Sequence, residues 1–511
     1  MTSTTGKTVL ESDFTYIQTP DVEPSPYVDD DVGFPNTSSP SIYNPVLPFD
    51  GPGNEGFSNK FLFGVLLGVP SLLSFFLLGL GIKTAIFLGI ILFFPLLVVF
   101  WTWTSWMSPP TNTKVKLPGR PVEHYVTFKD EQDKVRWAGR SKVPMPTFAE
   151  MYLDGKADFN GDCLDIMEMR HDWAHFGFTM ETFKFILGTF FVDILRHTKA
   201  VDDEQIRPTY DAGNDHYAFF LGPRMIYTSG IISDTTREES LEEMQDNKLA
   251  VICEKLELKE GETMLDIGCG WGTLAKFASV NYGAKVTGVT IAPNGAAWGN
   301  DVLKRAGVPE EQSKILCCDY RDIPKTKFKR ITQVEMGEHV GIKALTGFFR
   351  QCYDMLEDDG AMYVQLSGLR QAWQYEDFIW GLYLNKYIFP GADASTPLWY
   401  YVLCLERAGF EIKSIDTVGV HYSGTLWRWY RNWLGNKEAI TAKFGQRWYR
   451  IWELFLAWST IASRQGSATC FQFVVVKNLN TTHRISGVNS QNGLLGAIAA
   501  SAAAGKSRIL K

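Results

Sequence analysis

Met264-Leu-Asp-Ile-Gly-Cys-Gly-Trp-Gly272 is the stretch that decides the fold of this 511-residue chain. An apolar run ends at Ile267, three alternating glycines follow, and residues 273–278 are typical of a helix. A strand that ends in closely spaced glycines and opens a helix lets a cofactor lie against bare backbone near the helix N-terminus. The glycines stand closer together than in the dinucleotide pattern, which has two residues between its second and third glycines. The stretch therefore predicts a cofactor site at the end of a strand.

Apolar runs and helical patterns alternate over residues 205–480. Such alternation predicts an α/β fold, a doubly wound sheet of parallel strands with ligands at the carboxyl ends of the strands. The strand candidates are Thr263–Ile267, Lys285–Thr290, Lys314–Cys318, Ile331–Val334, Ala361–Leu366 and Phe471–Val476. The helix candidates are Leu274–Ser279, Asn294–Arg305, Leu345–Met355 and Pro397–Ala408.

The composition favours a protein that handles apolar material. The net charge is -7 and the pI is about 5.7, so no basic field points to nucleic acid. Aromatic residues make up 14% of the chain and include 16 tryptophans. The eight cysteines show no CxxC spacing and no secretory signal opens the chain, which predicts free thiols in a reducing compartment.

Two uncharged apolar runs, residues 61–80 and 84–103, follow a polar segment of residues 1–56 that we expect to be disordered. Twenty helical residues span about 30 Å, the hydrocarbon thickness of a bilayer. We therefore predict a transmembrane hairpin over residues 57–107, with spans of about 61–81 and 84–104. A pair of buried core helices is the alternative. The tryptophans Trp101, Trp103 and Trp106 fit an interfacial belt.

The charges beside the hairpin predict its orientation. Its tip carries only Lys83, whereas Lys60 precedes it and Lys114, Lys116 and Arg120 follow it. By the positive-inside rule, both termini and the large domain lie on the cytosolic side. We therefore expect an integral, multi-pass membrane protein with a cytosolic catalytic domain, in the endoplasmic reticulum.

Residues 108–204 are expected to connect the hairpin to the α/β domain as a helical region that faces the substrate or the membrane. Phe176–Leu195 is apolar but contains three charged residues, so it is predicted as a buried or membrane-surface helix. His171 and His175 are four residues apart but lack the glutamate that a zinc protease needs beside its first histidine, and no metal site is predicted. Residues 481–511, rich in Gly, Ala and Ser, are predicted to be a flexible tail.

Further motifs stand on both sides of the glycine turn. In chain order they are Tyr210-Asp-Ala-Gly-Asn-Asp-His-Tyr-Ala-Phe-Phe-Leu221, Met225-Ile-Tyr-Thr-Ser229, Val286-Thr-Gly-Val-Thr290, Asp319-Tyr-Arg-Asp322, Met336-Gly-Glu-His-Val-Gly341, Tyr387-Ile-Phe-Pro-Gly391 and His421-Tyr422. Over residues 205–480 this series resembles the cyclopropane fatty-acyl-phospholipid synthase and mycolic acid cyclopropane synthase superfamily. The resemblance implies a class I fold that binds S-adenosylmethionine (SAM).

Within that superfamily the chain resembles the fungal sphingolipid C9-methyltransferases, through its hairpin, Tyr227-Thr-Ser-Gly230 and Gln365. This resemblance implies methyl transfer from SAM to C9 of the unsaturated sphingoid base of glucosylceramide, a ceramide lipid, with the lipid bilayer as the second partner. Two other hypotheses stay open. One is a methyltransferase or cyclopropane synthase that acts on another unsaturated membrane lipid, and the other is a catalytically inactive, SAM-binding membrane scaffold.

The resemblance also implies which residues hold SAM. The methionine tail would lie along the glycine turn, and Thr290 with its neighbours would replace the acid that usually ends the second strand. The glutamine that the family places five residues after this threonine is Gly295 here. For Asp319–Asp322, a solvated charged turn is the alternative to cofactor contact. The implied cofactor residues are Tyr227, Thr228, Asp266, Gly268, Cys269, Gly270, Trp271, Gly272, Thr290, Ile291, Asn294, Gly295, Asp319, Tyr320 and Arg321.

The implied catalytic residues are Glu338, Tyr422, Ser229 and Gln365. The superfamily uses this glutamate, with a cysteine, a histidine and a tyrosine, to hold a bicarbonate that accepts a proton. Ser229 and Gln365 stand at the cysteine and histidine positions, where they can donate hydrogen bonds but add no charge. The sequence therefore leaves a bound bicarbonate open, and we expect Glu338 and Tyr422 to direct deprotonation.

Overall fold

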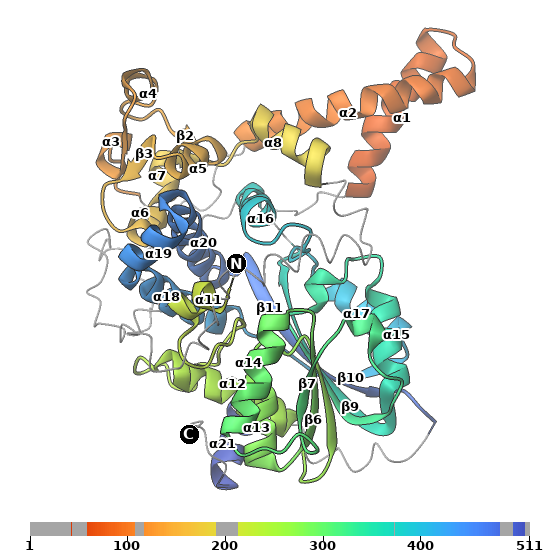
Figure 1. Cartoon of the computed structure of the whole chain (residues 1–511). Coiled ribbons are helices and arrows are strands. Elements are labelled where there is room, and N and C mark those ends of the chain that lie inside the picture. The colour runs from red at the N-terminus through yellow and green to blue at the C-terminus, as the bar shows by residue number, and fades with distance from the viewer. Residues whose placement is uncertain are drawn as a thin grey trace, which may run out of the picture.

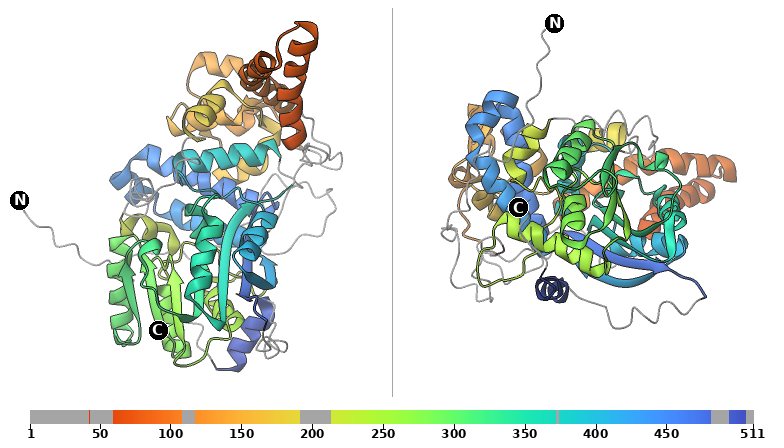
Figure 2. Two further views of the ribbon diagram at one scale, coloured as in Figure 1. Left: turned by 90° about the vertical axis from the view of Figure 1, so that its right-hand side faces the viewer. Right: turned by 60° about the horizontal axis from the view of Figure 1, so that its bottom comes forward.

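The computed structural model describes residues 42, 59–107, 117–190, 213–371, 374–480 and 494–505. An N-terminal helical hairpin, a small mixed region and a large α/β domain follow one another in these residues (Figure 1). The hairpin and the sheet of the large domain lie at opposite ends of the molecule (Figure 2). The prediction of disorder for residues 1–56 concerns a segment outside the described residues, apart from Ile42.

A seven-stranded sheet forms the centre of the large domain, in the order β10-β11-β9-β8-β5-β6-β7. Strands β7, β6, β5, β8 and β9 are parallel, as the sequence predicts, whereas β11 is antiparallel to both β9 and β10. The strands are β5 (Thr263–Ile267), β6 (Lys285–Thr290), β7 (Lys314–Cys317), β8 (Phe328–Val334), β9 (Leu356–Leu369), β10 (Phe410–Thr417) and β11 (Ala468–Lys477).

The edge strand β10 corrects the predicted sheet, which lacked it. Its sequence Phe410-Glu-Ile-Lys-Ser-Ile-Asp-Thr417 alternates polar and apolar residues, and most of its side chains are half-exposed. An edge strand with one solvent-exposed face has no continuous apolar run, and β10 therefore lacks the pattern that predicts a buried strand. The strand pairs only with β11, which separates it from the parallel part of the sheet.

Helices cover both faces of the sheet (Figure 1). Helices α12 (Leu241–Lys255), α13 (Thr273–Tyr282) and α14 (Pro293–Arg305) share one core with Met264 of β5. Helices α15 (Leu345–Met355) and α17 (Leu398–Arg407) share the opposite core with Leu265 and Ile267. Successive residues of a strand point to opposite faces, and the apolar run of β5 is therefore buried on both sides.

A layer of aromatic helices lies between the sheet and the small mixed region (Figure 1). It contains α11 (Asn214–Leu221), α16 (Tyr375–Tyr387), α18 (Gly419–Gly435), α19 (Lys437–Phe444) and α20 (Gln446–Arg464). Trp429, Trp433 and Trp458 are fully buried in this layer. Part of the high tryptophan content therefore serves core packing.

The small mixed region, residues 117–190, packs on α20 through α5 and α6. The helix predicted over Phe176–Leu195 begins at Met180, because Thr179 caps it, and residues 191–195 lie outside the described part. The elements are α3 (Val122–Tyr125), β1 (Val126–Phe128), α4 (Glu131–Arg136), β2 (Val143–Pro144), α5 (Met145–Leu153), β3 (Ala157–Phe159), α6 (Cys163–Glu168), α7 (Arg170–Trp173), β4 (Ala174–His175), α8 (Met180–Phe185) and the π-helix η3 (Ile186–Phe190).

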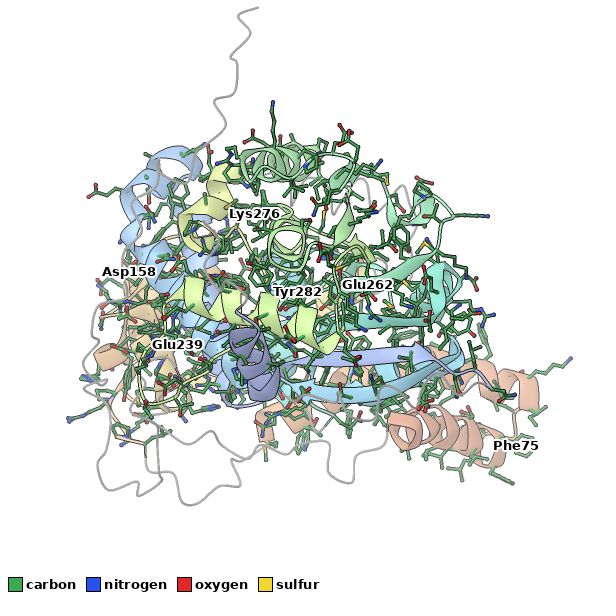
Figure 3. All side chains as sticks on the ribbon, turned by 90° about the horizontal axis from the view of Figure 1, so that it is seen from below. Phe75, Asp158, Glu239, Glu262, Lys276 and Tyr282 are labelled. Atoms are coloured by element: carbon green, nitrogen blue, oxygen red, sulfur yellow. The ribbon has the colours of Figure 1, made fainter. Side chains whose placement is uncertain are left out.

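The predicted hairpin is present as α1 (Asn59–Leu77) and α2 (Ile82–Met107), which pack against each other. By length and composition α2 can cross a membrane, and the shorter apolar part of α1 runs over Leu62–Leu77. Large apolar side chains such as Phe76 (74% exposed) face outward. Phe75 lies on the hairpin at the margin of the molecule in Figure 3.

The last turns of α2 dock on the body of the protein. Trp101 stacks on Phe178 at 5.6 Å between ring centroids, and the Tyr375 hydroxyl donates to Thr104 Oγ1 at 2.6 Å. Trp106 Nε1 donates to the Phe178 carbonyl at 3.0 Å. Trp101 and Trp106 thus also contact protein, while Trp106 is 43% and Trp103 66% exposed.

The predicted C-terminal tail contains an ordered helix, α21 (Leu494–Ala503). It packs on α12 (Figure 3), and its residues Ala497 and Ile498 are buried. The Tyr282 hydroxyl lies 3.4 Å from Ser501 Oγ. The buried side chains of Ala497 and Ile498 hold this helix against the domain, which corrects the expectation of a tail without structure for these residues.

Candidate active site

The three glycines after β5 all have positive φ, but each has a different neighbour. A β-carbon at Gly268 would lie 2.7 Å from Met336 Cβ, and one at Gly272 would lie 3.0 Å from Gly299 Cα. A β-carbon at Gly270 would meet no atom of the described residues within 4 Å. Gly268 and Gly272 are therefore required by packing within the protein, and Gly270 is the glycine that opens toward the cavity.

A cavity lies at the carboxyl ends of β5, β6 and β8, where the sheet order predicts a ligand. Most of the predicted cofactor residues line it together. Two do not, since Gly272 packs under α14 and Asn294 is exposed on its first turn. The predicted residues that line it are Tyr227, Thr228, Asp266, Gly268, Cys269, Gly270, Trp271, Thr290, Ile291, Gly295, Asp319, Tyr320 and Arg321.

An acid and a base face the cavity on one side of the glycine turn. Asp266 of β5 accepts a hydrogen bond from Thr332 Oγ1 at 2.7 Å, and burial raises its pKa to about 6. Lys248 of α12 donates to Thr228 Oγ1 at 2.5 Å, and burial lowers its pKa to about 8. The carboxyl group of Asp266 is complementary to an amino group, and the amino group of Lys248 is complementary to a carboxylate. The pair therefore suits an amino-acid tail such as that of SAM.

The opposite side of the cavity is formed by the turn after β7. Asp319 Oδ1 accepts from the Arg321 backbone N–H at 2.8 Å and from Arg321 Nε at 2.9 Å, and the guanidinium lies 4.8 Å from the centre of the Tyr320 ring. The turn is therefore held by its own side chains while it lines the cavity. It is more than a solvated charged turn.

The packing around position 295 accounts for the glycine that stands there in place of the family's glutamine. A β-carbon at this position would lie 2.8 Å from the Gly270 carbonyl oxygen. In this structure α14 therefore packs directly on the glycine turn, and any side chain at residue 295 would push the turn away.

The second cluster at the cavity centres on Glu335, which the sequence analysis did not select. Gln365 Nε2 donates to Glu335 Oε1 at 2.6 Å, and the Ser229 backbone N–H donates to the same oxygen at 3.1 Å. The Tyr422 hydroxyl donates to Glu335 Oε2 at 2.8 Å. The structure thus brings three of the four predicted catalytic residues together, on a different carboxylate from the predicted one.

Glu338, the fourth predicted catalytic residue, lies one turn further on and outside the cavity lining. Its Oε1 accepts from the Ser367 backbone N–H at 2.5 Å, while its Oε2 is buried with no hydrogen-bond partner among the described residues. Burial, and next the charge of Glu335, raise the pKa of Glu338 to about 8. At neutral pH this side chain is therefore mainly a protonated, uncharged acid.

The sequence contained a signal for Glu335. It directly follows β8, so it stands at the carboxyl end of a central parallel strand, where ligands bind. The family motif that begins one residue later contains Glu338, and the prediction followed that motif instead. Cys470, whose Sγ lies 3.7 Å from Glu335 Oε1, and Ser367 were also missed, because their contacts depend on the pairing of β9 and β11.

Three comparisons agree with this architecture. The family described as mycolic acid cyclopropane synthetase matches residues 197–473. Sphingolipid C9-methyltransferase B of Emericella nidulans is 72% identical over 98% of each chain, and sphingolipid C9-methyltransferase 1 of Gibberella zeae is 66% identical over 99% of each. The solved structure of mycolic acid cyclopropane synthase CmaA1 complexed with SAH and CTAB is 24% identical, has a TM-score of 0.50, and covers 53% of this chain and 97% of its own.

The sheet order, the open glycine turn and the cavity at the strand ends define a class I SAM-dependent methyltransferase. Within that class the chain belongs to the mycolic acid cyclopropane synthetase family, and in it to the sphingolipid C9-methyltransferases, which it matches over nearly its whole length. Its cofactor is SAM, and the residues of the cavity fit that cofactor in backbone shape and in charge.

Replacing Gly270 with leucine should weaken SAM binding at least tenfold, or about 1.4 kcal/mol. The new side chain would extend from the one turn glycine that opens toward the cavity. Isothermal titration of the purified protein measures this. Gly261→Leu is the matched control, because Gly261 also has positive φ (+77°) and open space around it but lies at the turn before β5. Equal SAM affinity in the two variants would contradict this placement of the cofactor.

Glu338 should make the folded state less stable as pH rises. Its folded-state pKa of about 8 exceeds its ordinary value of 4.5, so its stabilising contribution is complete below about pH 4.5 and lost as pH rises through 8. The glutamine of Glu338→Gln stays uncharged at every pH. The Tm of this variant minus the Tm of the unmodified protein should therefore increase from pH 5 to pH 9. Thermal unfolding across this range tests it, and parallel Tm curves would refute the assignment.

Proposed function

We propose that the protein transfers the methyl group of SAM to C9 of the unsaturated sphingoid base of glucosylceramide. The observation that carries the proposal is the near full-length similarity to proteins named sphingolipid C9-methyltransferase, hairpin included. The retained SAM cavity and the ordered Glu335 cluster argue against an inactive scaffold. An apolar lipid substrate also accords with the exposed hairpin.

The bound cofactor supplies an electrophilic methyl group on a sulfonium cation. The residues that would hold and orient it are those of the glycine turn on one side of the cavity and of the Asp319 turn on the far side. Tyr422, Ser229 and Gln365 take part through the carboxylate that they hold. Glu338 acts beside them as an uncharged neighbour.

We further propose that α1 and α2 span the membrane as a hairpin. Helix α2 has 26 residues, and at 1.5 Å per residue it is about 39 Å long, enough to cross the hydrocarbon core. Side chains along both helices are exposed and apolar. Only Lys83 lies at the tip of the hairpin, and the other nearby basic residues stand beside its ends, which supports a cytosolic catalytic domain, in the endoplasmic reticulum.

The product should be a methyl-branched sphingoid base that keeps its double bond. Purified enzyme in detergent is incubated with glucosylceramide of unsaturated base and SAM carrying a labelled methyl group. Mass spectrometry should show the gain of one CH2 unit, and NMR should show a methyl group on a carbon that remains in the double bond. Glucosylceramide with a saturated base is the control and should gain no label. Cyclopropane ring protons, or no product, would contradict the proposal.

Removing residues 1–97 should release the protein from membranes without loss of SAM binding. This cut keeps the docked end of α2, including Trp101, Thr104 and Trp106. A cut through Met107 is the comparison, and it should lower the Tm because it uncovers the aromatic surface around Phe178. Membrane flotation, SAM titration and thermal unfolding measure the three properties. Persistent membrane association of the shorter cut would argue against the hairpin as the anchor.

A further inference from the structure

We propose that Glu335 is the proton acceptor of the methyl transfer, and that it supplies from within the chain the anion that a bound bicarbonate would otherwise provide. The inference rests on the proposed function, because it concerns the reaction at the same cavity. It reassigns the role that the sequence analysis gave to Glu338 and a bicarbonate.

The hydrogen-bond donors available for a bicarbonate are already used. Gln365 Nε2 and the Ser229 N–H reach Glu335 Oε1, and the Tyr422 hydroxyl reaches Oε2. Weaker donors complete the set, with Ser367 Oγ at 3.4 Å from Oε2 and Cys470 Sγ at 3.7 Å from Oε1. A carboxylate has about four acceptor sites, so the three close donors leave one lone pair of Glu335 that can take a proton. A second anion in this place would find these donors already committed to Glu335 and would lie against its carboxylate, so the Glu335 cluster does not fit bicarbonate.

The donors around Glu335 are themselves fixed in place. Gln365 is fully buried, and its Oε1 accepts from the Tyr363 hydroxyl at 3.0 Å and from Gln472 Nε2 at 3.1 Å. The amide nitrogen of Gln365 must therefore face Glu335. Gln472 stands directly opposite Gln365 in the pairing of β9 and β11. The sheet thus builds the anion site from two strands.

The backbone of Glu335 is unusual in a way that accords with a functional role. Its φ is +54°, a left-handed conformation that side chains other than glycine rarely adopt. The Glu335 N–H donates to the Gln365 carbonyl at 2.8 Å, which holds this conformation. Strain of this kind persists where the surroundings enforce it, and it commonly occurs at active sites. Here it turns the carboxylate from the end of β8 into the cavity.

The chemistry balances with Glu335 as the acceptor. The π electrons of the substrate double bond form the bond to the incoming methyl group, and the pair of the broken S–C bond stays on sulfur. A positive charge then lies on the carbon beside the methylated one. A proton leaves the methylated carbon for a Glu335 oxygen, and its C–H pair re-forms the double bond. The negative carboxylate also stabilises the positive charge before the proton moves.

The geometry distinguishes Glu335 from Glu338 as the acceptor. Glu335 lines the cavity, whereas Glu338 does not, and one Glu338 oxygen is committed to the Ser367 amide. The raised pKa of Glu338 keeps it mainly protonated at neutral pH, and a protonated acid cannot accept the proton.

Three measurements on the full-length enzyme in detergent test the proposal. First, the unmodified enzyme should turn over equally in bicarbonate-free buffer and in buffer with added bicarbonate. Second, Glu335→Gln should lower kcat by 100-fold or more, the usual contribution of a general base, with SAM affinity changed less than threefold. Third, Glu335→Gly should lose turnover similarly but regain at least tenfold on addition of bicarbonate or formate, because it leaves an anion-sized space between the same donors.

Glycine suits the positive φ of residue 335, so the rescue variant should fold. Glu257→Gly is the matched control, because Glu257 also has a positive φ (+52°) but lies at the end of α12, outside the cavity lining. It should change turnover less than twofold, with or without bicarbonate. Dependence of the unmodified enzyme on added bicarbonate, substantial turnover by Glu335→Gln, or no rescue of a folded, SAM-binding Glu335→Gly would each overturn the proposal. If the unmodified enzyme formed no methylated lipid, that result would instead overturn the proposed function.

Discussion

The hydrogen bonds that converge on the Glu335 carboxylate constrain much of the catalytic domain. They come from the loop before α12, from β9, from α18 and from β11. Charge-assisted hydrogen bonds of this kind are short and directional. The four segments meet here because β11 runs antiparallel beside β9 and α18 packs against β11. The catalytic anion and the fold stabilise each other.

The sequence predicted the parts of the fold that depend on local pattern. Strands β5 and β6 and helix α15 have the predicted limits, because each is an apolar run or an amphipathic stretch between clear turn residues. The direction of β11 and the presence of β10 were not predicted, since no local signal gives the direction of a strand. The cofactor turn was predicted because its glycines form a local pattern. The contact between Ser229 and Glu335 was not predicted, because these residues are 106 positions apart in the chain.

The hairpin shows a similar limit. Its apolar runs gave the positions of α1 and α2 within a few residues, although helix α2 extends to Met107. The role of its tryptophans depended on what they touch. Trp101 and Trp106 would be typical of a membrane interface in an isolated helix, but in the structure they meet Phe178 and His175. Aromatic rings serve either purpose, so composition alone could not distinguish them.

The docking of α2 beside α16 has a consequence for how substrate is found. Because Tyr375 donates a hydrogen bond to Thr104 and Trp101 stacks on Phe178, these contacts restrict rotation of the hairpin relative to the catalytic domain. With the hairpin in a bilayer, the domain would not tumble, and enzyme and lipid would meet by lateral diffusion in two dimensions. The reacting double bond would then approach the carboxylate at a constant height above the membrane plane. The carbon that receives the methyl group would then be selected by its depth in the bilayer as well as by contacts between the protein and the lipid chain.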